Sequence, residues 1–238
     1  MKILNYIKLS FPNITNKNFK KFVTDEWIND NFMFYVDPKK HSNLIDFCDE
    51  MHANYLGKYF SGIWPAKHSY PESGKFLINF INSTKNDAVL DVGCGDNYYK
   101  DKVPNLIGLD PYHSAADIMQ TFEEFKTKIK FDHVIALGSL NFGTHPKDTK
   151  HIEEMFAKIV RLTKIGGYIH FRFNPGLDHK PIKKDKTSFM FIDWYPWTRE
   201  QLYKLFLKYN LKLIRFALEY NHQNDERFFV IVEKLNET

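Results

Sequence analysis

The residues with the clearest chemical meaning lie in the segment Val89 to Asn97, which reads Val-Leu-Asp-Val-Gly-Cys-Gly-Asp-Asn. A short apolar run leads into a turn with glycine at alternate positions, Gly93 and Gly95, and glycine lets the backbone approach a ligand closely. Asp91 stands two positions before the first glycine. At a dinucleotide site the ligand at such a turn is a pyrophosphate, which a carboxylate would repel. The turn therefore favours a ligand whose nearby end is cationic.

This segment resembles the first motif of class I S-adenosylmethionine-dependent methyltransferases, whose cofactor carries an amino group and a sulfonium. The resemblance covers roughly Tyr70 to the end of the chain. The family usually has a third glycine where this chain has Asn97, and asparagine tolerates the left-handed backbone that glycine supplies. The resemblance implies that S-adenosyl-L-methionine is the cofactor. The residues of this motif that we expect around it are Asp91, Gly93, Cys94, Gly95 and Asn97.

A second acidic residue follows the apolar run Ile107-Gly108-Leu109, about twenty residues after Asp91. By resemblance this residue, Asp110, accepts hydrogen bonds from both ribose hydroxyls, and Pro111 and Tyr112 flank the adenine. The alternative is an aspartate that caps a turn.

The segment Ala116-Asp117-Ile118 resembles the third-strand motif of the family. The resemblance implies that Asp117 accepts from the adenine amino group and that the backbone N–H of Ile118 reaches a ring nitrogen. Only six residues separate Asp110 from Asp117, too few for the usual intervening helix. Either that helix is missing, or Ser114 caps a helix and the third strand is absent.

The run Phe131 to Leu137 has the form of the fourth strand of the family, followed by its loop. The resemblance implies that Leu137, Gly138 and Ser139 line the cofactor. The residues expected to face the substrate are Asn141, Phe142 and His145. This loop is not the Asn/Asp-Pro-Pro-Tyr/Phe loop of amino-methylating DNA and glutamine enzymes, which argues against base-amine chemistry of that type.

Methyl transfer is an in-line displacement at an already activated sulfonium, so alignment supplies much of the rate and a general base is optional. If the acceptor must lose a proton, His145 and His113 are candidates, and Asn141 is a further candidate at the catalytic site. The alternative for each histidine is an ordinary loop residue. We identify no metal-binding pattern. The loop Asn174 to Lys186 and the aromatic segment Trp194 to Trp197 could bind substrate, or they are a solvated loop and an anchor for the next helix.

The elements that must position these residues alternate between helices and strands from Tyr70 onward. The expected helices are Pro71–Asn82, Ile152–Leu162 closed by Gly166-Gly167, and Arg199–Tyr209. The expected strands are Ala88–Val92, Asn105–Asp110, Ala115–Met119, Phe131–Leu137, Tyr168–Phe173, Lys212–Glu219 and Arg227–Glu233. This order predicts an α/β fold, a doubly wound and mostly parallel seven-stranded sheet with an antiparallel C-terminal strand.

The first 68 residues look helical, with expected helices over 25–35 and 42–60, the second capped by Ser42. We therefore predict two parts, a helical N-terminal extension or lid over 1–68 and a methyltransferase domain over 69–238. Hydrophobic residues at 43% and charged residues at 26% are typical of soluble globular proteins. The two cysteines, the lack of a signal peptide and the lack of a long apolar stretch favour a cytoplasmic protein with no membrane partner.

These patterns predict an S-adenosylmethionine-dependent methyltransferase that acts on an unidentified acceptor, a small molecule or a nucleic acid. The net charge of +4 allows a nucleic-acid partner without demanding one. The alternative is an S-adenosylmethionine-binding protein of the same fold without turnover, with a structural or regulatory role. A nicotinamide-dependent oxidoreductase is disfavoured by Asp91 and by the missing third glycine. The loop after Leu137 and the later Phe-Arg-Phe-Asn-Pro-Gly also resemble some phage-encoded methyltransferases of unassigned substrate.

Overall fold

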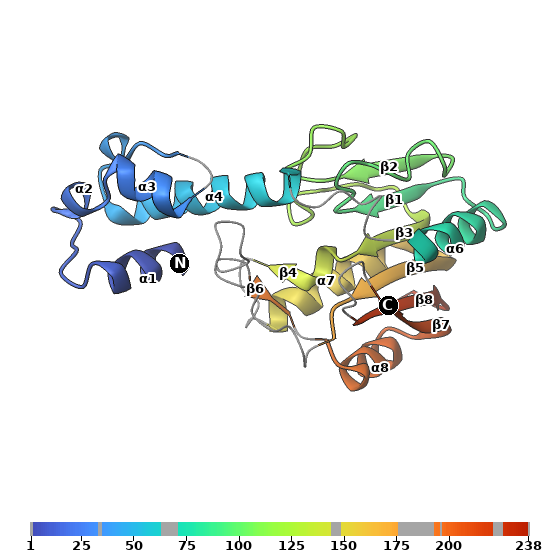
Figure 1. Ribbon diagram of the computed structural model, residues 1–238. Helices are drawn as coiled ribbons and strands as arrows, with labels where there is room; N and C mark the ends of the chain where they lie inside the picture. The colour runs from blue at the N-terminus through green and yellow to red at the C-terminus, as the bar shows by residue number, and fades with distance from the viewer. Residues whose placement is uncertain are drawn as a thin grey trace. The chain divides into compact units, whose positions relative to one another are not determined.

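The computed structural model describes residues 2–32, 35–62, 71–143, 149–175, 193–195, 197–220 and 226–237. They fall into two compact units, a helical one within 2–62 and an α/β one within 71–237 (Figure 1). The boundary predicted between residues 68 and 69 lies outside the described residues and stays a prediction, as does the role of a lid. No helix in the described ranges is long and apolar enough to cross a bilayer.

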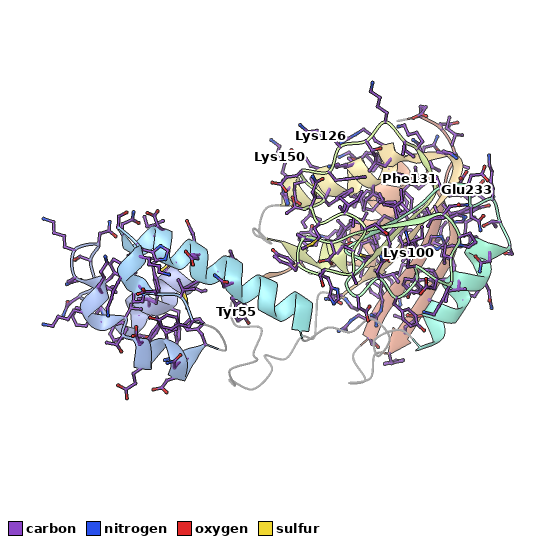
Figure 2. The ribbon with its side chains drawn as sticks, turned by 90° about the horizontal axis from the view of Figure 1, so that it is seen from above. Tyr55, Lys100, Lys126, Phe131, Lys150 and Glu233 are labelled. Carbon is purple, nitrogen blue, oxygen red and sulfur yellow. The ribbon has the colours of Figure 1, made fainter. Side chains whose placement is uncertain are left out.

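The helical unit contains α1 (Lys2–Ser10), α2 (Phe19–Phe22), α3 (Asp25–Asn31), the 3-10 helix η1 (Pro38–Lys40) and α4 (Leu44–Gly62). Its own core is formed by side chains that are fully buried or nearly so, Ile3, Ile7, Phe19, Phe47 and Met51. Tyr55, which is labelled on α4 in Figure 2, extends this buried row along the helix. Burial of these apolar groups supports a separate folded unit.

The sequence predicts Ser42 as the N-cap of α4, but the N-cap in the structure is Asn43. Asn43 Oδ1 accepts hydrogen bonds from the backbone N–H groups of Ile45 and Asp46, both at 2.9 Å. The Ser42 hydroxyl instead donates to the Asp46 carboxylate at 3.2 Å. Asparagine and serine are comparable N-caps, so only the position of the first helical turn decides between neighbours.

The α/β unit is built on a six-stranded sheet in the described residues, with the order β2-β1-β3-β5-β8-β7. Its strands are β1 (Val89–Val92), β2 (Leu106–Leu109), β3 (Phe131–Leu137), β5 (Thr163–Phe173), β7 (Leu211–Tyr220) and β8 (Glu226–Lys234). β2, β1, β3 and β5 run parallel, and β8 runs antiparallel to both β5 and β7. The predicted α/β sheet with an antiparallel C-terminal strand is confirmed.

The predicted third strand is reduced to one residue pair, so the described sheet has six strands and not the predicted seven. In the segment Ala115–Met119, Ile118 forms a single parallel bridge with Leu109 of β2. The bridge is closed by hydrogen bonds from Asp110 N to Ile118 O and from Ile118 N to Gly108 O, each 3.1 Å long. Residues 111–117 form bends and turns, so the alternative helix capped by Ser114 is also wrong. The short connection after Asp110 returns the chain to the sheet edge before a longer strand can pair.

Helices cover both faces of the sheet (Figure 1). α6 (Pro71–Asn82) covers one face, where Leu77 and Ile81 meet apolar side chains of β1, β3 and β8. α7 (Thr149–Leu162) and α8 (Arg199–Lys208) belong to the other face, whose core includes Phe156, Phe171 and Leu202. Thr198 caps α8 by accepting from Gln201 N at 3.2 Å, as the sequence predicts.

Gly166 and Gly167 do not close the preceding helix, contrary to the sequence-based expectation. β5 begins at Thr163, directly after α7, so both glycines lie inside the strand. Gly166 has a φ of 74°, and the pairing of β3 with β5 shifts between Phe131 and His133. The glycines therefore accommodate an irregularity in the strand, a known use of glycine in sheets.

A second, two-stranded sheet joins the loop after β3 to the segment before α8. β4 (Phe142–Gly143) pairs antiparallel with β6 (Asp193–Trp194). Trp197 is 1% exposed, and its Nε1 donates to Leu140 O at 3.2 Å; Tyr195 is also buried. The prediction that these two rings stack on a substrate is therefore wrong. They anchor the start of α8 instead. The side chain of Trp194, residue 196 and the loop residues 176–186 lie outside the described part of the chain.

Candidate functional site

The site lies where the carboxyl ends of β1 and β3 adjoin. The chain passes from β1 to β2 on one side and then to β3 on the other side of β1. Such a switch point in strand order is where open α/β sheets bind ligands. The turn after β1 and the loop after β3 touch, because a Cβ built on Gly93 would lie 2.8 Å from Ser139 Cβ. Only glycine fits at position 93.

The turn after β1 has the backbone that its sequence predicts. Gly93, Gly95 and Asn97 have φ values of 74°, 55° and 55°, all left-handed. The N–H groups of Gly93 and Cys94 both donate to Leu109 O, at 2.7 and 3.1 Å. Asn97 thus adopts the conformation expected of a glycine. Its side chain also donates to Ala115 O at 2.9 Å, which ties the turn to the segment after β2.

Asp91 carries an uncompensated buried carboxyl group. It is 3% exposed, and its oxygens accept no hydrogen bond and meet no cation among the described residues. Burial, then the neighbouring charges of Asp110 and Asp96, raise the pKa of Asp91 to about 8. The same surroundings raise the pKa of the Cys94 thiol, with burial first and Asp91 next, so this thiol stays neutral. Asp91 therefore stays mostly protonated in the ligand-free protein near neutral pH, and a cationic ligand beside it would favour its ionised form.

Three further polar atoms near the turn are buried without a partner in the described part of the structure. They are Asp96 Oδ1 and Asn97 Oδ1 in the turn and Ser139 Oγ in the loop after β3. Buried polar atoms normally have hydrogen-bond partners, so unpaired ones at a sheet switch point indicate a polar ligand. Sequence reasoning missed Asp96, although an acid inside the glycine turn was a visible signal.

Asp110 closes the turn that follows β2. Its Oδ1 accepts from Tyr112 N and His113 N at 2.8 and 3.0 Å, and its Oδ2 accepts from Gly95 N at 3.1 Å. The turn-capping alternative is therefore confirmed. A carboxylate has about four acceptor sites, which leaves room for one ligand hydroxyl. The predicted contact with both ribose hydroxyls stays a prediction. Pro111 and Tyr112 are half-buried beside it.

Asp117 and Ile118 are committed to contacts within the protein. Asp117 Oδ2 accepts from Gly108 N at 2.7 Å, and Lys100 Nζ lies 2.8 and 2.9 Å from the two carboxylate oxygens (Lys100 is labelled in Figure 2). Burial alone would raise the pKa of Asp117, but the hydrogen bonds from Gly108, Lys100 and Asn97 lower it. Because Ile118 N already donates to Gly108 O, it is not free for the predicted adenine contact.

Asp117 and Ile118 make these internal contacts because the connection after Asp110 is short and pairs Ile118 with β2. The next residue along, Met119, is 58% exposed. It follows the bridge as Asp110 follows β2, so it lies toward the same edge of the sheet.

The end of β3 brings the remaining predicted cofactor residues to this edge. Leu137 pairs with Arg172 of β5, and Gly138, with a φ of 95°, donates to Arg172 O at 3.1 Å. Leu137, Gly138 and Ser139 thus follow β3 beside the turn that contains Gly93.

Of the candidate bases, only His113 has a described side chain. Its Nδ1 accepts from Ala115 N at 3.3 Å, so one ring nitrogen is used locally. His145 and the side chain of Asn141 lie outside the described residues. Within the described ranges no three histidine, cysteine or acidic side chains are grouped so that they could hold a metal ion.

Comparison with known proteins gives matches among solved structures alone. No family model and no curated protein sequence matches the chain. The 1,6-didemethyltoxoflavin-N1-methyltransferase of Burkholderia thailandensis, solved with 1,6-didemethyltoxoflavin and S-adenosylhomocysteine, is similar at a TM-score of 0.58 and 11% identity. That match covers 85% of this chain and 99% of the other.

Two further structures give similar results. The methyltransferase CcbJ of Streptomyces caelestis has a TM-score of 0.51 and 10% identity, covering 74% of this chain and 95% of its own. A SAM-dependent methyltransferase of Methanosarcina mazei has a TM-score of 0.50 and 15% identity, covering 71% and 99%. At these identities the likeness concerns the fold. The chain therefore has the fold of class I S-adenosylmethionine-dependent methyltransferases.

Proposed function

We propose that this protein binds S-adenosyl-L-methionine at the carboxyl ends of β1 and β3 and transfers its methyl group to an acceptor. The observation that carries the proposal is the Asp91 carboxyl group, buried beside Asp96 and Asp110 without a cation in the described structure. A ligand with an amino group and a sulfonium supplies the missing positive charge. A pyrophosphate would add to the negative charge.

The residues present fit this cofactor. Gly93 leaves the space that a Cβ would fill, and Asp96 Oδ1 and Ser139 Oγ lack partners in the described structure. In our proposal Asp91 and Asp96 face the cationic end, and Asp110 accepts from one ribose hydroxyl. The adenine lies near Pro111, Tyr112 and Met119, in place of the contacts first expected from Asp117 and Ile118. Leu137, Gly138 and Ser139 border the methionine end.

The chemistry that the cofactor supplies is a methyl group already activated by the sulfonium. The protein then has to exclude water and align an acceptor, which accounts for much of the rate of such displacements. The neighbour from Burkholderia thailandensis was solved with a small heterocycle, and that supports including small molecules beside nucleic acids among the acceptors tested. The phage origin stays a prediction.

Calorimetric titration tests the proposal directly. S-adenosylmethionine and S-adenosylhomocysteine should bind, and NAD should not. Asp91→Asn should weaken S-adenosylmethionine binding by about tenfold or more, about 1.5–3 kcal/mol for a lost charged hydrogen bond. Asp101→Asn removes an exposed aspartate from the same connection between β1 and β2 and should leave the affinity unchanged. Equal affinity in a folded Asp91→Asn variant would contradict the proposal.

Turnover is tested separately with S-adenosylmethionine carrying a labelled methyl group. The protein is incubated with pools of small molecules and of RNA and DNA, and label transfer is measured. Transfer to either pool supports an enzyme. Cofactor binding without transfer favours the alternative of a binding protein without turnover.

A further inference from the structure

The strand β7 forms an open edge of the sheet. β7 pairs with β8 on one side and with no described strand on the other. At the opposite edge, the segment around Ile118 bridges to β2 and partly covers it. Ile214, Leu218 and Tyr220 of β7 are 38%, 44% and 60% exposed. An edge strand with free backbone groups and exposed apolar side chains is a template for pairing with another strand.

The second half of β7 is regular enough to pair. The register with β8 shifts between Leu213 and Arg215, which places a bulge at Ile214. From Arg215 to Tyr220 the pairing with Ile231 to Glu226 is uninterrupted. Bulges protect edges by bending them, so the protected part of β7 is its first half.

The regular stretch Arg-Phe-Ala-Leu-Glu, residues 215–219, is complementary to itself in the antiparallel direction. Arg215 and Glu219 stand two residues before and after Ala217 and have opposite charges. Phe216 and Leu218 stand one residue before and after it, and both are apolar. When two such strands run antiparallel with Ala217 opposite Ala217, each arginine lies opposite a glutamate and each phenylalanine opposite a leucine.

The two kinds of side chain also lie on different faces of the sheet, as alternation along a strand requires. The Arg215 guanidinium lies 4.2 Å from the ring centroid of Phe76 on α6. The Phe216 ring is stacked at 6.2 Å on Tyr203 of α8, which covers the other face. A shift of the pairing by one residue would put charged and apolar side chains on the same face, so the register is specified.

The existing ion pairs leave Arg215 available. Lys212, the other basic residue of β7, pairs with Glu233 of β8 at 3.4 Å (Glu233 is labelled in Figure 2). Glu219 Oε2 lies 3.9 Å from Arg172 Nε, and a carboxylate has about four acceptor sites, so it can bind a further basic group without losing this contact. Arg215 contacts the Phe76 ring and meets no carboxylate among the described residues.

We propose that a second copy of this chain pairs antiparallel along β7, with Ala217 on the two-fold axis, and so joins the two six-stranded sheets into one. Cross-strand pairs of opposite charge and of aromatic with aliphatic side chains stabilise such contacts, and like charges opposite one another destabilise them. A two-fold interface uses the same patch on both copies, which the sequence of residues 215–219 satisfies. This inference does not depend on the proposed catalytic function.

Light scattering coupled to size exclusion tests the pairing on the full chain. The wild type should be dimeric at high concentration and dissociate on dilution. Arg215→Glu and Glu219→Arg each place like charges opposite one another at both ends of the pairing, so each variant alone should be monomeric. Mixed together, the two variants have opposite charges at both positions and should form a heterodimer. Leu207→Lys is the control: it introduces a charge at an exposed residue of α8, 84% exposed and outside β7, and should leave the dimer intact.

Oxidative cross-linking tests the register and does not rely on charge. Directly opposed residues of antiparallel strands have Cα atoms about 4.5–5.5 Å apart, within the range that a disulfide spans. Ala217→Cys should therefore form a disulfide-linked dimer under mild oxidation, whereas Leu207→Cys should not. The native Cys48 and Cys94 are buried. A wild type that is monomeric at every concentration, or a dimer that persists in the Arg215→Glu variant, would overturn the proposal. Circular dichroism and cofactor titration of each variant separate this result from misfolding and from the cofactor proposal.

Discussion

At the scale of single residues, the protein keeps one acid in a position that opposes folding. Asp91 is buried next to Asp96 and Asp110, and its charged form is disfavoured first by burial and then by these neighbours. A carboxyl group retained for stability would have a cationic or hydrogen-bonding partner, as Asp132 has in Lys164 at 2.9 Å. Asp91 therefore has the properties of a residue that is retained for binding.

This difference gives a stability prediction for Asp91→Asn. The pKa of Asp91 is raised from its ordinary value of 3.8 to about 8 in the fold, so the unfolded chain releases the proton first. Folding stability is therefore lost as pH rises from about 4 to about 8. Asparagine does not titrate, so the ligand-free variant should be more stable than the wild type at pH 7, by up to about 4 kcal/mol.

Urea unfolding at pH 5 and pH 8 checks this expectation. The advantage of Asp91→Asn should be larger at pH 8, while its affinity for S-adenosylmethionine is lower than that of the wild type. If the variant is less stable than the wild type at both pH values, Asp91 has a structural role and the interpretation is wrong.

At the scale of elements, the turn between β1 and β2 positions the site through contacts with the loop after β3. Gly93 and Gly166 have the same φ of 74°, but only at Gly93 would a side chain meet another atom within 4 Å. Substitutions at these two glycines therefore distinguish the effect of backbone strain, which both positions share, from the effect of the close approach of the two loops, which only Gly93 has.

Gly93→Ala and Gly166→Ala form a matched pair of variants. Each should lose about 1–2 kcal/mol of unfolding free energy from left-handed strain. Gly93→Ala should lose more, because the new Cβ would lie 2.8 Å from Ser139 Cβ, and should also lose cofactor affinity. Gly166→Ala should bind normally. Chemical denaturation and calorimetry measure the two effects, and equal behaviour of the two variants would argue against a cofactor at this turn.

A second element-scale feature is a buried histidine pair that joins β3 to β5. His133 Nδ1 and His170 Nε2 are 3.0 Å apart, and His133 Nε2 is 2.9 Å from Thr84 Oγ1. Both histidines are fully buried. Burial lowers the pKa of His133 to about 4 and that of His170 well below its ordinary value of 6.5. Both rings are therefore neutral in the folded protein near neutral pH.

The pair should make the fold sensitive to acid. In the unfolded chain these histidines take up protons as pH falls below about 6.5, while the folded protein excludes them. Stability is therefore lost from about pH 6.5 downward, by about 2 kcal/mol per ring at pH 5. The double variant His133→Phe/His170→Phe should show a smaller loss between pH 7 and pH 5 in urea unfolding, whatever its stability at pH 7. An unchanged pH slope would count against this account.

At the scale of the whole molecule, the chain contains two units that each bury their own core. The helical unit encloses Phe19, Phe47 and Met51, and the α/β unit encloses Phe131, Phe171 and Val230 (Phe131 is labelled in Figure 2). A ligand stabilises the unit that holds it by mass action. The cofactor site that we propose uses only residues of the α/β unit.

Scanning calorimetry tests this division. We expect two transitions, and S-adenosylmethionine at about 100 times its dissociation constant should stabilise one of them by about 2.7 kcal/mol. The transition that shifts should coincide with the loss of the β-strand signal in circular dichroism. The other transition should stay at the same temperature. One transition that shifts as a whole would show that the two units unfold together.

The sequence by itself determined the features that depend on neighbouring residues. The helix Pro71–Asn82, the hairpin strands β7 and β8, the Thr198 cap and the left-handed turn through Gly93, Gly95 and Asn97 were all predicted. Periodicity, capping residues and glycine preferences act over a few residues, so these features are visible in the chain order. The sign of the charge that the turn favours was also readable, because Asp91 is part of the same short segment.

Only the tertiary structure decided the features that depend on contacts between distant segments. Asp117 is held by Gly108 and Lys100, and Ile118 is used in a bridge, and neither contact is visible in the sequence. Trp197 is buried against Leu140, which no local pattern distinguishes from a stacking residue. The pairing of His133 with His170 likewise joins two strands across 37 positions of sequence. Such contacts are fixed by sheet register and by the length of the connections, and their partners are set by packing of the whole unit.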